Sequence, residues 1–146
     1  MALRACGFIV FRRLASRIPS LDSIEYLLLQ TSYGKHHWTP PKGHVDPGED
    51  DLTTALRETK EEAGLGAEDL QVVDGFIQEL HYEVQGKPKE VLYWLAELRD
   101  PAIAVTLSDE HQDYRWAKLD EACALAQYKD LQETLRAAHR HLQDKQ

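Results

Sequence analysis

The stretch at residues 43–65, GHVDPGEDDLTTALRETKEEAGL, predicts the main helix of this chain and the place where its chemistry lies. A turn at Pro47-Gly48 leads into a helix expected over residues 51–63, which Asp50 or Asp51 can cap. Gly64 follows, and glycine favours the left-handed conformation that ends many helices. At 100° per residue, the stripe expected to face the core is Leu52, Ala55, Leu56, Thr59 and Ala63.

Another face of this helix is acidic. Glu58, Glu61 and Glu62 stand at i, i+3 and i+4, and each like-charged pair destabilises an isolated helix by roughly a few tenths of a kcal/mol. Arg57, four residues before Glu61, is expected to neutralise only one of them, and Glu49 can fold back toward the same cluster. Such oxygen ligands suit Mg²⁺, with Mn²⁺ as the second choice. The alternative is a solvated acidic surface.

The spacing within this stretch is itself a pattern. With U for a bulky aliphatic residue, it reads G-x5-E-x7-R-E-U-x-E-E-x-G-U on Gly43, Glu49, Arg57, Glu58, Glu61, Glu62, Gly64 and Leu65. The stretch resembles the box of the Nudix hydrolases, and only Thr59, which stands at the first aliphatic site, departs from it. The resemblance implies an α+β fold, an α/β/α sandwich with a mixed sheet flanked by helices. It also implies that water, assisted by a divalent cation, hydrolyses a phosphoanhydride.

The resemblance further implies roles for single residues. Glu58 is expected to act as the base or as a ligand beside it, Glu62 is the second catalytic candidate, and Arg57 is expected to orient a carboxylate. A carboxylate outside the box commonly completes the metal site, and Glu110, just before His111, matches that position. The expected metal ligands are Gly43, Glu58, Glu61, Glu62 and Glu110.

The flanks of the box bear on the substrate. Residues 38–44, WTPPKGH, and residues 108–116, SDEHQDYRW, resemble the branch of this family that splits diadenosine tetraphosphate asymmetrically into ATP and AMP. A dinucleoside polyphosphate is therefore the expected substrate. Lysines can contact its phosphates and tyrosines can stack on its adenines. The candidates are Lys42, Lys87 and Lys89 for phosphate, Tyr82 and Tyr114 for adenine, and His37 as a further substrate contact. Ordinary surface lysines and core tyrosines are the alternatives.

Other activities stay open within the same pattern. The enzyme alternatives are pyrophosphohydrolases that act on RNA 5′ caps, on diphosphoinositol polyphosphates or on nucleotide sugars. A nucleotide-binding regulator without catalysis is the alternative from another class, although every carboxylate of the box is present.

Composition limits the remaining classes. The 146 residues, 42% hydrophobic and 29% charged, are expected to form one domain over 1–146, acting as a monomer. A net charge of −8 argues against general binding to nucleic acid or to an anionic membrane. Cys6 and Cys123 lack metal or redox spacing, which favours buried thiols in a reducing compartment. No membrane span or signal peptide is recognisable. A cytoplasmic protein is expected, with the nucleus as a further possibility and mitochondria less favoured.

Periodicity predicts the other elements. Strands are expected at residues 3–11, 24–30, 70–84, 90–98, 103–107 and 113–119. A hairpin connection at 85–88 joins two of them, residues 12–23 form a loop, and the two prolines within 36–44 impose an extended backbone. A helical segment begins at Asp120, and residues 131–142 carry apolar side chains at helical spacing.

Overall fold

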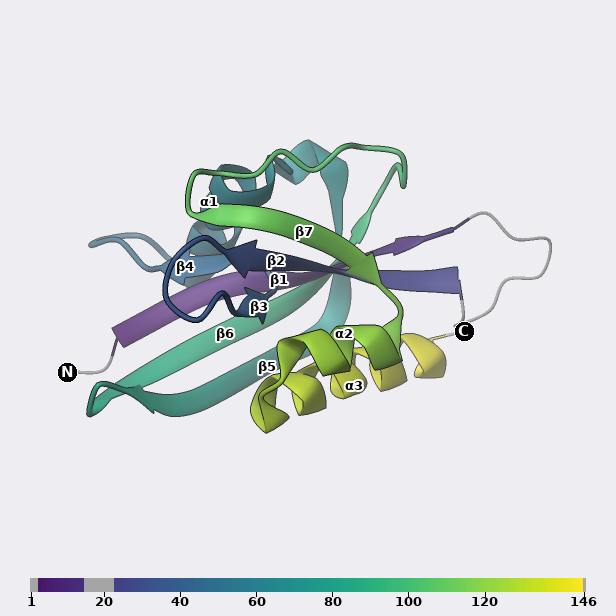
Figure 1. Ribbon diagram of the computed structural model, residues 1–146. Coiled ribbons are helices and arrows are strands. Elements are labelled where there is room, and N and C mark those ends of the chain that lie inside the picture. Colours follow the sequence, from purple (N-terminus) through teal and green to yellow (C-terminus); the bar gives the residue numbers. More distant parts are fainter. Residues whose placement is uncertain (1–2, 15–22, 146) are drawn as a thin grey trace.

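A mixed β-sheet with helices on both faces forms the structure (Figure 1), a computed structural model that describes residues 3–14 and 23–145. The strands are β1 (Leu3–Arg13), β2 (Ile24–Thr31), β3 (Trp38–Thr39), β4 (Lys42–His44), β5 (Leu70–Val84), β6 (Lys87–Leu98) and β7 (His111–Ala117). The helices are α1 (Asp51–Ala63), α2 (Leu119–Ala126) and α3 (Lys129–Asp144), with a short 3-10 turn, η2 (Ala67–Asp69). The predicted α+β sandwich is confirmed. Most of the loop expected over 12–23 lies outside the described residues.

The central strand β1 has two different neighbours along one edge. It runs parallel to β6 along its other edge, from Leu3 to Phe11. Near its C-terminal end it pairs antiparallel with β2, whereas near its N-terminal end it pairs antiparallel with β4. The chain before β4 crosses β1 so closely that a Cβ on Gly7 would lie 2.1 Å from the carbonyl oxygen of Pro41. Glycine at this position lets β4 enter the sheet beside the start of α1.

Two cores, one on each face of the sheet, follow from the alternation of side chains along the strands. In β6 the side chains of Val91, Tyr93 and Leu95 pack toward α2 and α3. The alternate side chains of Leu92, Trp94 and Ala96 pack toward α1 on the opposite face, and Figure 1 shows these helices on opposite sides. The predicted alternation of β6 is therefore confirmed, with Trp94 only partly buried.

The boundaries of several elements differ from those predicted. Gln85 and Gly86 have φ angles of 53° and 78°, so the hairpin turn has two residues with positive φ and β6 begins at Lys87. Strand β7 begins at His111, two residues before the predicted start, and the C-terminal part holds two helices separated at Gln127-Tyr128.

The strand predicted at residues 103–107 is wrong. Alternating side chains of this segment, Ile103, Val105 and Leu107, do pack against the core beneath α1. Its backbone pairs with no strand among the described residues, because the amide of Thr106 donates to the carbonyl of Ala63 at the end of α1, at 2.9 Å. The alternation of apolar residues in this segment therefore predicts which side chains are buried, but among the described residues the segment lacks the hydrogen bonds to a neighbouring strand that define a β-strand.

Helix α1 begins and ends as the sequence predicts. The Asp50 carboxylate accepts a hydrogen bond from the amide of Thr53 at 2.8 Å, and Gly64 has a φ of 73°. The buried stripe is only partly correct, since Ala55, Thr59 and Ala63 are buried but Leu56 is half-buried and Leu52 is 41% exposed. Two polar side chains, Thr54 and Glu62, are buried in addition. Apolar periodicity cannot find them, because hydrogen bonds rather than hydrophobicity permit their burial.

Cys6 and Cys123 are both buried and free, as expected. None of the helices within residues 3–14 and 23–145 has the length and the apolar character needed to cross a bilayer.

Thr59 generates a prediction about stability. Its hydroxyl is buried and has no hydrogen-bond partner within the described chain, and an unsatisfied buried hydroxyl costs about 1–3 kcal/mol. Thr59→Val keeps the shape and removes the hydroxyl, so we expect the free energy of unfolding to rise by about 1 kcal/mol in urea denaturation.

Thr54→Val is the matched control for this substitution. Thr54 is equally buried in the same helix, but its hydroxyl donates to the carboxylate of Glu49, so the same change should destabilise the protein. A loss of stability in Thr59→Val would mean that its hydroxyl has a partner.

Candidate active site

A cleft with a volume of about 1320 Å³ lies where β4, α1 and the β5–β6 hairpin meet the loop before β7. One part of its wall is acidic and another is basic and aromatic. The acidic part includes Glu58, Glu61 and Glu62 of α1 and Glu110, whereas the basic part includes Lys42 of β4 and Lys89 of β6.

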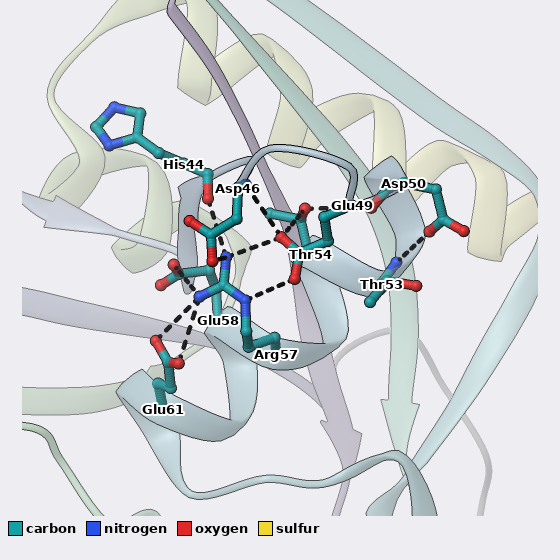
Figure 2. A network of polar contacts seen from close by, with 9 residues as sticks. All are labelled: His44, Asp46, Glu49, Asp50, Thr53, Thr54, Arg57, Glu58 and Glu61. Carbon is teal, nitrogen blue, oxygen red and sulfur yellow. Dashed lines mark hydrogen bonds and ion pairs between the residues drawn. The ribbon is translucent and has the colours of Figure 1, made fainter.

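The guanidinium of Arg57 organises the acidic wall (Figure 2). It donates to both oxygens of Glu49, at 2.8 and 2.9 Å, to Glu58 at 2.8 Å, to Glu61 at 3.3 Å and to the carbonyl of His44 at 3.0 Å. The expectation that Arg57 neutralises only one carboxylate is therefore wrong, because a planar guanidinium with five N–H groups can reach several acceptors. These contacts fix the positions of Glu49, Glu58 and Glu61 and join α1 to β4.

Glu49 folds back toward the acidic cluster, as predicted, and is held from three sides. Besides Arg57, it accepts hydrogen bonds from the hydroxyl of Thr54 and, at 3.2 Å, from the amide of Asp46. The bonds from Arg57 and then from Thr54 lower the pKa of Glu49 to about 2. Glu49 therefore stays ionised and serves as a fixed anchor for Arg57.

Gly43 lies directly against the carboxyl group of Glu58. A Cβ on Gly43 would lie 2.0 Å from Glu58 Cδ, so any other residue would displace this carboxylate. Strand β4 pairs with β1 at Gly43 and Cys6. This pairing places the backbone of β4 at Gly43 beside Glu58 of α1. Spacing alone marked Gly43 as important, and the close approach explains why.

Glu62 is a buried acid. It is 8% exposed, and its Oε1 accepts a hydrogen bond from the amide of Lys42 at 3.0 Å. Burial raises the pKa of Glu62 to about 8, against the opposing effect of the Lys42 amide. Burial also raises the pKa of Glu58, although Arg57 opposes the shift. The positive charge around Glu58 and Glu62 is therefore too small to offset the effect of burial on their pKa values.

Glu110 faces the same carboxylates from the loop before β7, since its charge contributes to the raised pKa of both Glu58 and Glu62. The loop is tied at two points. The amide of Ser32 donates to the carbonyl of Glu110 at 2.8 Å, and the amide of Ser108 donates to the carbonyl of Glu62 at 3.4 Å. Glu110 is thereby brought to α1 from 48 residues along the chain.

The residues present fit a hard divalent cation. The donors are carboxylates and a backbone carbonyl, and the raised pKa values of Glu58 and Glu62 mark a deficit of positive charge. As arranged, no three acidic, histidine or cysteine side chains of the described chain converge closely enough to hold an ion. Glu58 and Glu61 are both bonded to Arg57, so ligation requires at least the exposed Glu61 to turn from it.

Three of the lysine and histidine side chains that line the cleft affect one another's charge: Lys42, Lys89 and His44. Lys89 lies beside Lys42, and burial together with this neighbour lowers the pKa of Lys89 to about 8. Burial, Lys89 and Lys42 lower the pKa of His44. Tyr82 pairs with Lys89 across the β5–β6 ladder and lines the cleft.

A second aromatic pair stands at the cleft near α3. The rings of His37 and Tyr128 have centroids 5.2 Å apart, and the Tyr128 hydroxyl lies 3.5 Å from His37 Nε2. His37 follows His36, which has a φ of 57°, and Tyr128 follows Gln127, which has a φ of 70°, so each ring comes directly after a residue with positive φ.

Most of the predicted site residues line this one cleft: Gly43, Glu58, Glu61, Glu62, Glu110, Lys42, Lys89, Tyr82 and His37. Three do not. Arg57 lies behind the carboxylates, Lys87 is exposed near the hairpin turn, and Tyr114 lies on β7 outside the cleft lining. The position of Tyr114 in the 108–116 motif does not reveal which face of β7 its side chain occupies.

Several cleft residues carried no usable sequence signal. Tyr33, Tyr93, His111 and Tyr128 line the cleft but were not predicted to do so. Tyr93 belongs to the alternating core pattern of β6, and Tyr128 lies between two helices with no motif around it. His111 was noted only as the neighbour of Glu110.

Comparison with known proteins agrees with this geometry. The family model described as NUDIX domain matches residues 12–142. The chain belongs to the Nudix family, and the resemblance of residues 43–65 to the box of that family is confirmed.

Within the family, the resemblance of the flanks to one branch is also confirmed. The chain is 58% identical over 144 residues to bis(5′-nucleosyl)-tetraphosphatase [asymmetrical] of Mus musculus and 60% identical to that of Sus scrofa, with 97% of each chain covered. The crystal structure of a C. elegans Ap4A hydrolase binary complex superposes with a TM-score of 0.90 at 46% identity, covering 98% of this chain and 99% of that one.

The buried Glu62 generates a prediction for the metal-free protein. A carboxyl whose pKa rises from about 4.3 in the unfolded chain to about 8 in the fold lowers stability as pH rises through that window. Glu62→Gln abolishes this loss and keeps an acceptor for the Lys42 amide. In EDTA we expect the variant to match the wild type near pH 4 and to exceed it by a few kcal/mol at pH 9, measured by urea denaturation.

Glu61→Gln is the control, because Glu61 lies on the same helix with its side chain exposed. It should show no comparable gain at high pH. Lower stability of Glu62→Gln at pH 9 would contradict the assigned burial cost.

Proposed function

We propose that this protein hydrolyses diadenosine tetraphosphate asymmetrically to ATP and AMP with Mg²⁺ as its cation. One observation supports the proposal: a chain 60% identical to an enzyme of that name holds Glu58, Glu61 and Glu62 of the Nudix box in one cleft together with Lys42 and Lys89. A substrate with four linked phosphates needs both the acidic and the basic part of the cleft. Carboxylates hold its cation, and lysines contact its phosphate oxygens.

In this mechanism Glu58 would have two roles and the other carboxylates one. Glu58, Glu61, Glu62, Glu110 and the carbonyl of Gly43 would hold the cation, and Glu58 accepts the proton of the attacking water. A bound Mg²⁺ supplies positive charge at the phosphate oxygens and lowers the pKa of that water. Arg57 keeps Glu58 in position through its 2.8 Å bond and remains behind the site.

The basic and aromatic part of the cleft would orient the substrate. We assign the neutralisation of phosphate oxygens to Lys42 and Lys89, and their position in the cleft lining beside the acids supports this role. Tyr82 and the pair of His37 and Tyr128 offer aromatic faces for adenine. Fixing one adenosine away from the carboxylates directs water to one end of the tetraphosphate, which makes the cut asymmetric.

The proposed setting is the cytoplasm, and the proposed working unit is a monomer. Two buried free cysteines, Cys6 and Cys123, are compatible with a reducing compartment. Every residue assigned above comes from one chain, so a partner subunit is not needed to complete the cleft.

Product identity tests the proposal. Incubated with diadenosine tetraphosphate and Mg²⁺ in H₂¹⁸O, the protein should release ATP and AMP in equal amounts, with one ¹⁸O in only one of them, by chromatography and mass spectrometry. Two molecules of ADP would overturn the asymmetric cut. Glu58→Gln controls for contaminating phosphatases and should lose the activity by orders of magnitude.

The alternative activities are outcomes of the same assay. Faster cleavage of a capped RNA 5′ end, a diphosphoinositol polyphosphate or a nucleotide sugar would replace the proposed substrate. Tight binding of the dinucleotide without turnover at any Mg²⁺ concentration would favour a regulator.

Tyr82 and Tyr114 form a matched pair for the adenine contact. They are 38% and 39% exposed, but only Tyr82 lines the cleft. A stacked base contributes about 1–3 kcal/mol, so Tyr82→Ala should raise KM by roughly tenfold or more in steady-state kinetics. Tyr114→Ala should leave KM unchanged. If Tyr82→Ala lowers stability without raising KM, Tyr82 is a packing residue.

A further inference from the structure

The segment before β7 is bonded to the C-terminal end of α1. The last carbonyl groups of a helix have no partner within the helix, so other donors can bind them. The amide of Thr106 donates to the carbonyl of Ala63 at 2.9 Å. The amide of Ser108 donates to the carbonyl of Glu62 at 3.4 Å. The segment therefore caps α1, and Ser108 lies beside the backbone of Glu62.

Ser108 is also the first residue of a tight turn. The amide of His111 donates to the carbonyl of Ser108 at 3.2 Å, which closes a four-residue β-turn with Glu110 at its third position. The amide of Glu110 donates to the Ser108 hydroxyl at 3.3 Å, a local contact that serine favours in turns. The same hydroxyl is hydrogen-bonded to Nδ1 of the buried His111 at 3.3 Å. The Ser108 hydroxyl is therefore bonded to both residues that end the turn.

These contacts make Ser108 a link between two acids that are distant in the sequence. Its amide is bonded to the backbone of Glu62, and its hydroxyl is bonded to the backbone of Glu110. The side chains of both acids line the cleft. Because Glu110 is exposed, hydrogen bonds to its backbone, rather than packing around its side chain, determine where its carboxylate lies.

We propose that Ser108 is a positioning residue, which holds Glu110 at a fixed place relative to Glu62 so that both carboxylates can bind one divalent cation. The inference rests on the proposed function for the assignment of these two acids to the cation, and it adds a residue that acts through Glu110. A ligand that is already held in place loses less conformational freedom when the cation binds than a ligand on a loose turn does.

Ser32 provides a matched control. Its hydroxyl donates to the carbonyl of Asp109 at 3.0 Å, so Ser32→Ala also removes a hydroxyl contact with the turn. The amide of Ser32 donates to the carbonyl of Glu110 at 2.8 Å, and this bond remains in the variant because it belongs to the backbone. Ser32→Ala therefore weakens the attachment of the turn without removing a contact to Glu110.

Mn²⁺ binding to the full chain in the absence of substrate tests the proposal, with free Mn²⁺ measured by electron paramagnetic resonance. We expect Ser108→Ala to raise the Kd for Mn²⁺ by roughly tenfold or more, as is typical when a residue that supports a metal ligand is removed. Ser108→Thr, which keeps the hydroxyl, and Ser32→Ala should stay close to the wild type. Circular dichroism checks that each variant folds. An unchanged Kd in Ser108→Ala, or an equal rise in Ser32→Ala, would overturn the proposal.

A double variant separates positioning from a general structural role. Glu110→Gln should raise the Kd for Mn²⁺ by itself, because it removes a carboxylate. If Ser108 acts through Glu110, adding Ser108→Ala to Glu110→Gln should cause little further rise, since both changes remove the same contribution. A further rise as large as that of Ser108→Ala alone would contradict the proposal, and so would an unchanged Kd in Glu110→Gln. Because binding is measured without turnover, failure of the proposed dinucleotide hydrolysis would leave this result unaffected.

Discussion

The interaction on which the site depends is the one between Arg57 and the carboxylates around it. Helix α1 places several acids on adjacent turns, an arrangement that repulsion would otherwise disfavour. A single guanidinium binds Glu49, Glu58 and Glu61 and also reaches the carbonyl of His44 on β4. Because its contacts join the helix to the strand, they fix the acidic wall and attach that wall to the sheet.

Two charged groups of the cleft, Glu62 and Lys89, form no ion pair with Arg57 or with another side chain of opposite charge among the described residues. Glu62 is buried without a cationic side chain bonded to it, and Lys89 is half-buried beside another lysine. Burial shifts the pKa of each group toward its neutral form, to about 8 in both cases, so that Glu62 is mainly protonated near pH 7. Strong pKa shifts of opposite charge within one cleft are typical of functional sites, where stability is lost for chemistry.

The cleft itself follows from how β1 shares its edge. Strand β2 pairs with only the C-terminal end of β1, and β4 occupies the other end, so the two neighbours diverge from a common strand. Gly7 and Gly43 permit the two closest approaches, one to Pro41 and one to Glu58. The same arrangement brings Lys42 beside Glu62 through the backbone amide of Lys42.

The sequence by itself determined what depends on near neighbours in the chain: α1 with its Asp50 cap and Gly64 end, the alternation of β6, and the box that identifies the family. Only the tertiary structure decided which side chains meet. It excluded Tyr114 and Lys87 from the cleft, and it added Tyr128. It left residues 103–107 without a partner strand among the described residues, and it brought Lys42 and Lys89 to one cleft. The physical reason is that burial, strand pairing and pKa depend on contacts between distant segments, which local periodicity does not encode.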